Sequence, residues 1–401
     1  MKSIEGGVTV PEGFKSAGIT CGIKASGKKD MALIYSEKLA KAAAVFTTNE
    51  VKAAPVQVSQ NKIKNGKARA IVINSGNANA CTGKKGLADA RKMSKLTGEN
   101  LNLDSEEILV ASTGIIGELL DMEKITKGIK QLTSELEEDD LRAAEAILTT
   151  DNEIKRVSYS FELPVSQKEV KIGGIAKGSG MIHPNMATML GFITTDLKIS
   201  NNLLSQALRE AVKYSFNRIS VDGDQSTNDS VFLLANGLAG NTEIQEKNED
   251  YYLFLKVLKK VAVFLAKAIV SDGEGATKFV TIKIKEATGE AQADKVARNI
   301  ANSNLVKTAL FGNDPNWGRI LAAAGTADSK VEPEKITVKL NGEKLYEKGE
   351  PVDVSENKLS GLINTKNISI EVLLGCGESE LEFWTSDLSY DYIEVNADYH
   401  T

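Results

Sequence analysis

The sequence predicts a mixed α/β fold. Short apolar runs of the kind found in strands alternate along the 401 residues with longer stretches of helical periodicity. At 43.1 kDa the chain is long enough for one large or two moderate domains with a substantial core. No low-complexity tract, heptad run or repeat period interrupts the alternation. This alternation of two kinds of segment is therefore the basis of the fold prediction.

The predicted strands are short apolar runs, and they cover residues 31–35, 70–74, 108–111, 170–175, 189–195, 231–235, 280–284, 336–340 and 368–374. The predicted helices cover residues 87–96, 122–136, 140–148, 203–216, 250–270 and 292–301. Asn341 and Gly342 follow the run 336–340 and precede residues 344–346, and this pair is typical of a type I′ hairpin turn. Charged stretches are predicted to be surface loops or helix ends, at residues 134–140, 242–250 and 329–335.

Histidine and cysteine are scarce, which argues against several common kinds of site. With only His183 and His400 in the chain, a Ser-His-Asp or Cys-His mechanism has few candidate bases, and a metal site of several histidines is nearly excluded. Cys21, Cys81 and Cys376 are widely spaced and odd in number, so they fit neither a zinc motif nor a secreted disulfide framework. We therefore expect a cytoplasmic protein with no metal.

Charge and hydropathy point to small-molecule partners. The net charge is -5 and the pI is near 5.5, and the basic residues are spread along the sequence, so no basic footprint for nucleic acid is present. Residues 1–7 contain no apolar signal core, and the most apolar stretch, 261–270, is interrupted by Lys267. The sequence predicts a soluble chain that is neither exported nor inserted in a membrane.

The segment 177–191 is the most informative for function. A loop of glycines and a proline runs into Ala187, which is followed by Thr188 and by an apolar run that ends at Ile193 and resembles a buried strand. If the peptide bond before Thr188 is cut, the freed α-amine, with a reference pKa of about 7.7–8.0, can act as base for the hydroxyl of the same residue. The alternative is an ordinary glycine-rich turn that enters a core strand, and the local pattern alone favours it.

Two further glycine-rich segments follow apolar strands. In residues 108–117 the hydroxyl of Thr113 and the backbone N–H of Gly114 can both point at one oxyanion, although an ordinary strand-to-helix turn explains the pattern about equally well. The asparagine-dense residues 74–83 suit a tight polar loop, and we expect them to serve loop architecture and not catalysis.

The C-terminal half holds further polar clusters. Glu274 lies between glycines after the helix 250–270, where it is either a ligand for a substrate ammonium group or a solvated acid. Residues 313–319 are dense in turn formers and either bind a ligand or order an interface. The terminus, 395–401, carries Tyr, His and Asn, which suggests that the last residues are packed.

Taken together, these segments closely resemble the ornithine acetyltransferase family, the glutamate N-acetyltransferases of arginine biosynthesis. The resemblance runs the whole length and rests on residues 74–83, 112–114, 149–151, 177–191, 272–275, 313–319 and 396–401. The segment 177–191, with its Lys-Gly-Ser-Gly-Met-Ile start and its Pro-Asn-Met-Ala-Thr-Met-Leu end, is long and specific. No position that the family needs departs from its pattern.

The resemblance implies autocatalytic cleavage between Ala187 and Thr188. The products are an α chain of residues 1–187 and a β chain of residues 188–401 that stay associated, and two such pairs form an α2β2 heterotetramer. It also implies an α/β sandwich similar to that of the self-processing DmpA-like aminopeptidases, which resembles N-terminal-nucleophile hydrolases in chemistry but not in topology.

The implied activity is acetyl transfer from N2-acetylornithine to glutamate through an acetyl-Thr188 intermediate, with Thr113 and Gly114 as the oxyanion hole. The residues implied to bind the amino-acid substrate are Thr150, Lys177, Thr188, Glu274, Asn396 and Thr401. Glu274 is expected to receive the ornithine δ-ammonium group, whereas Lys177 either receives a carboxylate or favours the ionised nucleophile. No cofactor is expected, and acetyl-CoA is left open as a second acetyl donor.

Two other functions remain as alternatives. A related self-processing amidase or aminopeptidase would use water as the acceptor in place of glutamate. A non-catalytic amino-acid-binding protein would use the same loops without turnover and would remain one intact chain.

Overall fold

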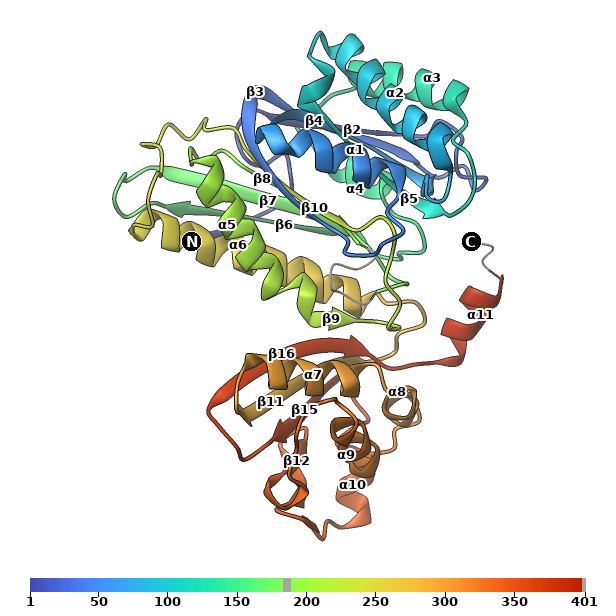
Figure 1. The fold of residues 1–401 in the computed structure, drawn as a ribbon, viewed down its shortest axis with the longest axis vertical. Coiled ribbons are helices and arrows are strands. Elements are labelled where there is room, and N and C mark those ends of the chain that lie inside the picture. Colours follow the sequence, from blue (N-terminus) through green and yellow to red (C-terminus); the bar gives the residue numbers. More distant parts are fainter. Residues whose placement is uncertain (183–188, 399–401) are drawn as a thin grey trace.

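The computed structural model describes residues 1–182 and 189–398, and in these residues it shows two units that lie end to end (Figure 1). The larger unit is built around one long sheet, and the smaller unit holds a second sheet formed mostly by the C-terminal part of the chain. The prediction of a mixed α/β fold is confirmed. Of the two sizes considered, one large or two moderate domains, the structure shows two units. No helix in the described ranges is both long enough and apolar enough to span a bilayer.

The first sheet has nine strands in the described residues, in the order β1-β6-β7-β8-β10-β3-β4-β5, with β2 also paired to β3. They are β1 (Lys2–Ile4), β2 (Phe14–Ile19), β3 (Met31–Phe46), β4 (Lys67–Asn77), β5 (Ile108–Ile115), β6 (Lys155–Glu162), β7 (Glu169–Lys177), β8 (Leu190–Thr195) and β10 (Ser230–Ala235). The first part of β3 pairs with β2 and β4, and its last part pairs with β10. A register shift between Tyr35 and Ala40 separates the two parts, so β3 belongs to both halves of the sheet.

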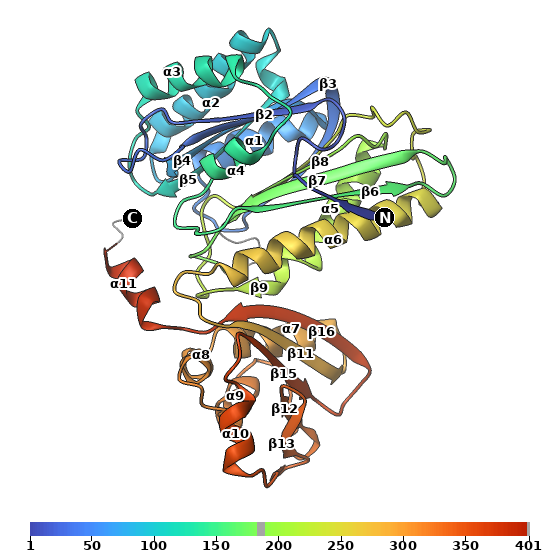
Figure 2. The same ribbon diagram turned by 180° about the vertical axis from the view of Figure 1, so that it is seen from behind.

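The two halves of this sheet pack face to face, and helices cover their outer faces (Figure 2). Ile34 and Ile73 from one half share a core with Phe192 and Phe232 from the other. The outer face of the β2–β5 half is covered by α1 (Ala54–Lys62), α2 (Gly83–Leu101) and α3 (Met122–Ser134). The outer face of the other half is covered by α5 (Asn201–Lys213) and α6 (Glu249–Ser271), while the short α4 (Leu141–Ala146) packs on β2 and β3. These four layers form the predicted α/β sandwich.

The second sheet has its own core. In the described residues its strand order is β14-β13-β12-β15-β11-β16-β9. The strands are β9 (Ile219–Ser220), β11 (Phe279–Ala287), β12 (Thr337–Leu340), β13 (Glu343–Glu347), β14 (Glu350–Pro351), β15 (Asn367–Leu373) and β16 (Ser379–Ser386). The helices of this unit are α7 (Glu290–Ala301), α8 (Asn304–Phe311), α9 (Trp317–Gly325) and α10 (Glu356–Leu362). Asn341 and Gly342 both have positive φ, at 46° and 85°, which confirms the predicted type I′ hairpin between β12 and β13.

Short 3₁₀ turns complete the described fold, at η1 (Ile63–Asn65), η2 (Ser105–Glu107), η3 (Phe216–Arg218) and η4 (Pro333–Lys335). The last helix, α11 (Tyr390–Asp398), projects from the side of the molecule after β16 in both views (Figures 1 and 2). None of its described side chains is buried, and Tyr390 and Ile393 are largely exposed. The prediction that the terminus is packed is therefore wrong for residues 395–398, because this helix lies on the surface of the chain.

Candidate active site

Six of the predicted site residues line one pocket of the larger unit. They are Thr113, Gly114, Thr150, Lys177, Glu274 and Asn396. They come from the end of β5, the loop after α4, the last residue of β7, the loop after α6, and α11. The remaining predicted site residues, Ala187, Thr188 and Thr401, lie outside the described residues. The pocket thus gathers segments that are far apart in the sequence and that belong to both predicted chains.

The pocket adjoins both ends of the segment that carries Thr188. Gly180 and Met181, just before that segment, line the pocket. On the other side, the backbone N–H of Met189 donates to Oδ1 of Asp229 at 2.9 Å. Asp229 is fully buried, and this burial raises its pKa well above the usual range. Asn228, its neighbour, also lines the pocket, so the chain resumes beside the site immediately after Thr188.

The turn at Thr113 and Gly114 is held rigidly against the end of β4. Gly114 has a φ of 131°, and a Cβ there would lie only 2.3 Å from the carbonyl carbon of Gly76. Only glycine therefore allows this close approach of the two strand ends. The amide of Asn228 donates to the carbonyl oxygens of Ser112 and Ala78, at 2.8 and 2.7 Å, and so joins the two loops. The Gly114 N–H and the Thr113 hydroxyl belong to a preorganised backbone, as an oxyanion hole requires.

Lys177 brings a buried ammonium group to this turn. Its Nζ donates to Oγ1 of Thr113 at 3.4 Å and lies 3.8 Å from Oδ2 of Asp151. Burial lowers the pKa of Lys177, and the neighbouring carboxylate of Asp151 opposes that shift. A cation held within a pocket of this kind can bind a substrate carboxylate or stabilise negative charge that develops beside it.

Glu274 brings a carboxylate to the same pocket. Its backbone N–H donates to the carbonyl oxygen of Ser179 at 2.9 Å, and its Oε2 accepts from Nδ2 of Asn396 at 2.9 Å. The carboxylate lies against Gly180, where a Cβ would come within 2.1 Å of Oε2. A glycine at this position therefore leaves the room that the carboxylate occupies. The half-buried carboxylate is suited to bind an ammonium group.

Thr150 also lines the pocket. Its hydroxyl oxygen is 2.7 Å from that of buried Ser179, and the two hydroxyls share a hydrogen bond. Ser226 and Asn228 also line the pocket, although neither residue was predicted from the sequence. The available signal was weak, because Ser226 and Asn228 belong only to a polar stretch that precedes a buried strand.

The other polar clusters of the sequence have structural roles. Asn74 and Asn79 donate from their amides to the carbonyl oxygens of Asn77 and Gly86, at 2.8 and 3.0 Å, so the asparagine-rich loop is held by its own side chains as expected. Residues 313–319 lie in the smaller unit, where Asn316 caps α9 by accepting from the N–H of Arg319.

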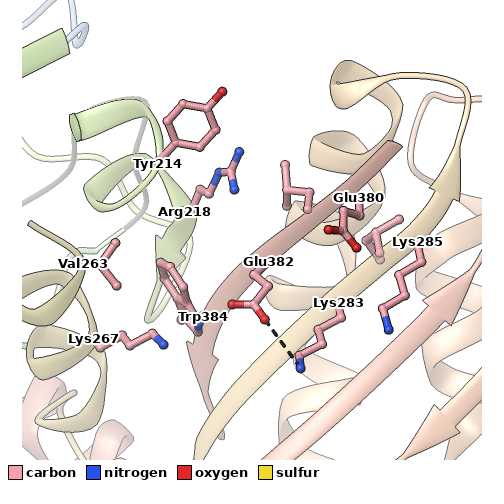
Figure 3. Close-up of a pocket in the computed structure, with 11 residues that line it drawn as sticks. Tyr214, Arg218, Val263, Lys267, Lys283, Lys285, Glu380, Glu382 and Trp384 are labelled. Carbon is pink, nitrogen blue, oxygen red and sulfur yellow. Dashed lines mark ion pairs between the residues drawn. The ribbon is translucent and has the colours of Figure 1, made fainter. Parts of the chain in front are cut away.

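A separate cavity of about 500 Å³ lies between the two units (Figure 3). None of the predicted site residues that the structure describes lines it. Its charged groups pair largely with other protein side chains: Lys283 lies 3.5 Å from Glu382 on the next strand, and Arg218 lies 3.0 Å from Glu290. Lys267 covers the ring of Trp384. The cavity is therefore a charged junction between the units, and the pocket around Thr113 and Lys177 is the better candidate for catalysis.

Comparisons with known proteins agree on one family. The family model described as the ArgJ family matches residues 15–401. The arginine biosynthesis bifunctional protein ArgJ of Bacillus licheniformis is 46% identical over 402 residues, which cover 100% of this chain and 98% of that protein. The protein of the same name from Caldanaerobacter subterraneus subsp. tengcongensis is 48% identical over 406 residues, which cover 100% of both chains. A crystal structure of the arginine biosynthesis bifunctional protein ArgJ from Bacillus halodurans is 40% identical, with a TM-score of 0.51, and the match covers 53% of this chain and 100% of the solved chain.

Proposed function

The chain belongs to the ArgJ family, and we propose that it transfers the acetyl group of N2-acetylornithine to glutamate in arginine biosynthesis, through an acetyl-Thr188 intermediate. The observation that carries the proposal is the convergence of Thr113, Gly114, Lys177 and Glu274 on one pocket beside the segment that holds Thr188. The pocket offers one cation and one carboxylate, which match the carboxylate and ammonium groups of an amino-acid substrate.

In this proposal the nucleophile is made by self-cleavage. The Thr188 hydroxyl attacks the carbonyl carbon of Ala187, and the acyl group moves from nitrogen to oxygen, which frees the α-amine; water then hydrolyses the resulting ester to give the free hydroxyl and the Ala187 carboxylate. The solved relative supports this step, because its whole chain matches 53% of the present one, and a separate chain of residues 188–401 would hold 214 of the 401 residues, the same share. The two products would stay together, because residues 172–177 of β7 from the first pair with the whole of β8 from the second.

Catalysis then proceeds as a ping-pong cycle. The α-amine of Thr188 takes the hydroxyl proton while the oxygen attacks the acetyl carbon, and Thr113 and Gly114 donate to the oxyanion that forms. The amine returns the proton to the departing α-nitrogen of ornithine. The α-amine of glutamate next attacks the acetyl ester and regenerates Thr188. Water must be kept from the acyl-enzyme, since otherwise the acetyl group would be lost as acetate.

In this proposal, substrate recognition divides between the two charged side chains that line the pocket. Glu274 receives the δ-ammonium group of ornithine, and Thr150, Asn396 and Thr401 contribute polar contacts. Lys177 receives a carboxylate or stabilises charge near the nucleophile. No cofactor is needed, but acetyl-CoA serves as a second donor in this proposal, and the word bifunctional in the names of the relatives supports that addition.

We further propose an α2β2 assembly that works in the cytoplasm. The free state of all three cysteines supports a reducing compartment.

The proposal is tested by product analysis and by intact mass. Purified protein is incubated with N2-acetylornithine, with and without glutamate, and then with acetyl-CoA and glutamate. The proposal expects two chains, the second beginning Thr-Met-Leu-Gly, and N-acetylglutamate only when glutamate is present. Acetate and ornithine formed equally well without glutamate would favour the amidase or aminopeptidase alternative. One intact chain that binds the amino acid without turnover would favour the binding-protein alternative.

Replacing Glu274 with glutamine is expected to weaken the use of N2-acetylornithine and to leave self-cleavage intact. The amide keeps the size of the side chain but loses the charge that pairs with the δ-ammonium group, so KM should rise about ten- to a hundredfold. The control is Glu378→Gln, on an exposed loop before β16, which should behave as the unchanged enzyme. Steady-state kinetics with varied acetylornithine measures the effect, and unchanged kinetics would remove Glu274 from the site.

A further inference from the structure

The buried carboxylate of Asp151 lies next to the site, and Asp151 is not among the predicted site residues. The side chain of Asp151 is fully buried, and each of its oxygens is occupied. Oδ1 accepts from the backbone N–H of Gly178 at 2.6 Å, and Oδ2 accepts from that of Thr149 at 3.0 Å. The carboxylate therefore fixes the residues that flank Thr150 and Lys177, two of the predicted substrate ligands.

Asp151 also belongs to a buried group of alternating charges. Nζ of Lys155 lies 2.8 Å from Oδ1 of Asp151 and 2.5 Å from Oδ2 of Asp272. Asp272 in turn accepts from the backbone N–H groups of Asn152 and Glu153, at 3.1 Å each. Within the described residues, Lys155 thus has two close carboxylates, whereas Lys177 has ion-pair contact with Asp151 alone.

We propose that Asp151 is a positioning residue that holds the Lys177 ammonium group, in its charged form, against the hydroxyl oxygen of Thr113. The inference rests on the proposed function, because it assigns a purpose to Thr113 as an oxyanion donor. The Lys177 ammonium group donates a hydrogen bond to the Thr113 hydroxyl oxygen. The hydroxyl proton therefore points away from Lys177 and can be donated to the substrate. An adjacent cation also makes that hydroxyl a stronger donor toward developing negative charge.

The charges around Lys177 explain why it depends on Asp151. Burial lowers the pKa of Lys177, and nearby Lys155 lowers it further, while Asp151 opposes both, with weaker help from Glu274 and Asp229. Lys24 adds a third cation to this region, and burial lowers its pKa to about 8. Burial alone would raise the pKa of Asp151, but Lys177 and Lys155 together hold that pKa well below its usual range. Asp151 therefore stays ionised throughout the working pH range.

Removing the charge of Asp151 is expected to lower the pKa of Lys177. In Asp151→Asn the shape is kept, but Lys177 loses the carboxylate that opposes desolvation, whereas Lys155 retains Asp272. We expect the pKa of Lys177 to fall further below its ordinary value. The ammonium form is then lost at a lower pH than in the unchanged enzyme. The basic limb of the pH profile of kcat should move to lower pH, so kcat measured on that limb should fall relative to the unchanged enzyme.

The experiment combines kinetics with direct titration of Lys177. The enzyme is labelled with [ε-¹³C]lysine, the Lys177 resonance is assigned by its loss in Lys177→Arg, and it is followed with pH in the unchanged protein and in variants. The matched control is Asp272→Asn, which also removes a carboxylate from Lys155 but has no ion-pair contact with Lys177. The proposal expects a lower titration midpoint in Asp151→Asn only.

The outcomes separate the inference from the proposed function. An unchanged Lys177 midpoint in folded Asp151→Asn, or an equal shift in Asp272→Asn, would overturn the inference. A shifted midpoint in a protein without acetyl transfer would reject the proposed function and keep the pairing. If Asp151→Asn does not accumulate as folded protein, Asp151→Glu replaces it, because the longer side chain cannot keep the carboxylate at its bonds to Gly178 and Thr149. A Lys177 midpoint in that variant identical to the unchanged protein would likewise overturn the inference.

Discussion

Thr188→Ala is expected to give a single intact chain of 43.1 kDa without transferase activity. Alanine has no hydroxyl to attack the Ala187 carbonyl, so neither the ester nor the free N-terminal amine can form. The same hydroxyl would accept the acetyl group in the mature enzyme. One substitution therefore removes both processing and turnover, and kcat should fall by at least about 10⁴-fold. Denaturing intact mass measures the first effect, and N-acetylglutamate formation measures the second.

Thr188→Ser is the control for this experiment. Serine keeps a β-hydroxyl and, after cleavage, an α-amine on the same residue, so it should still cleave and retain part of the activity. A cleaved Thr188→Ala protein would refute the proposed processing, because water or another residue would then cut the chain. An uncleaved but active protein would refute the role of Thr188 as terminal nucleophile.

Much of the fold could be predicted because its central strands are apolar. Each predicted strand and helix falls on an element of the same type in the structure. The strands that were missed include β2, β6 and β16, which mix small, polar and charged residues with apolar ones. Their pairing and not their composition makes them strands, since β6 and β16 each bond along their length to a neighbouring strand.

The path of β3 shows a second limit of sequence reasoning. Only residues 31–35 were predicted as a strand, but the strand continues to Phe46 through an exposed stretch at residues 37–39. That stretch breaks the apolar pattern, and the register shift that joins the two halves of the sheet falls there. Long-range pairing with β10 determines this continuation, and no local pattern encodes it.

In the candidate site, too, local patterns predict some residues, and only the folded structure reveals the others. Motifs identified groups that line the pocket, because a glycine turn, as at Gly114, or a charge between glycines, as at Glu274, leaves a local signature. The roles of the buried residues that support the site could not be predicted from local motifs. Asp151 and Asp272 lie in two of the segments that carry the resemblance, 149–151 and 272–275, but no role was predicted for either residue. They form a charged network because Lys155 contacts both of them, across 4 and 117 residues.

Thr113→Val is expected to lower kcat about 10²–10³-fold with little change in KM. Valine has nearly the shape of threonine, so the buried turn keeps its packing and loses only the hydroxyl. The negative charge on the substrate oxygen develops in the transition state, which is why the loss should appear in kcat and not in binding. Thr113→Ser, which keeps the hydroxyl, is the control. Intact mass must first show that both variants are cleaved, so that the kinetics report on turnover.

Thr113→Val also tests how Asp151 and Lys177 affect catalysis. If Asp151 acts on catalysis through Lys177 and the Thr113 hydroxyl, its contribution to kcat disappears once that hydroxyl is gone. Asp151→Asn should then reduce kcat much less in a Thr113→Val background than in the unchanged enzyme, whereas independent effects would multiply. Multiplying effects would mean that Asp151 serves another part of the site, such as the backbone beside Thr150. An unchanged kcat in Thr113→Val alone would remove the hydroxyl from the oxyanion hole and leave the N–H of Gly114 as the proposed donor.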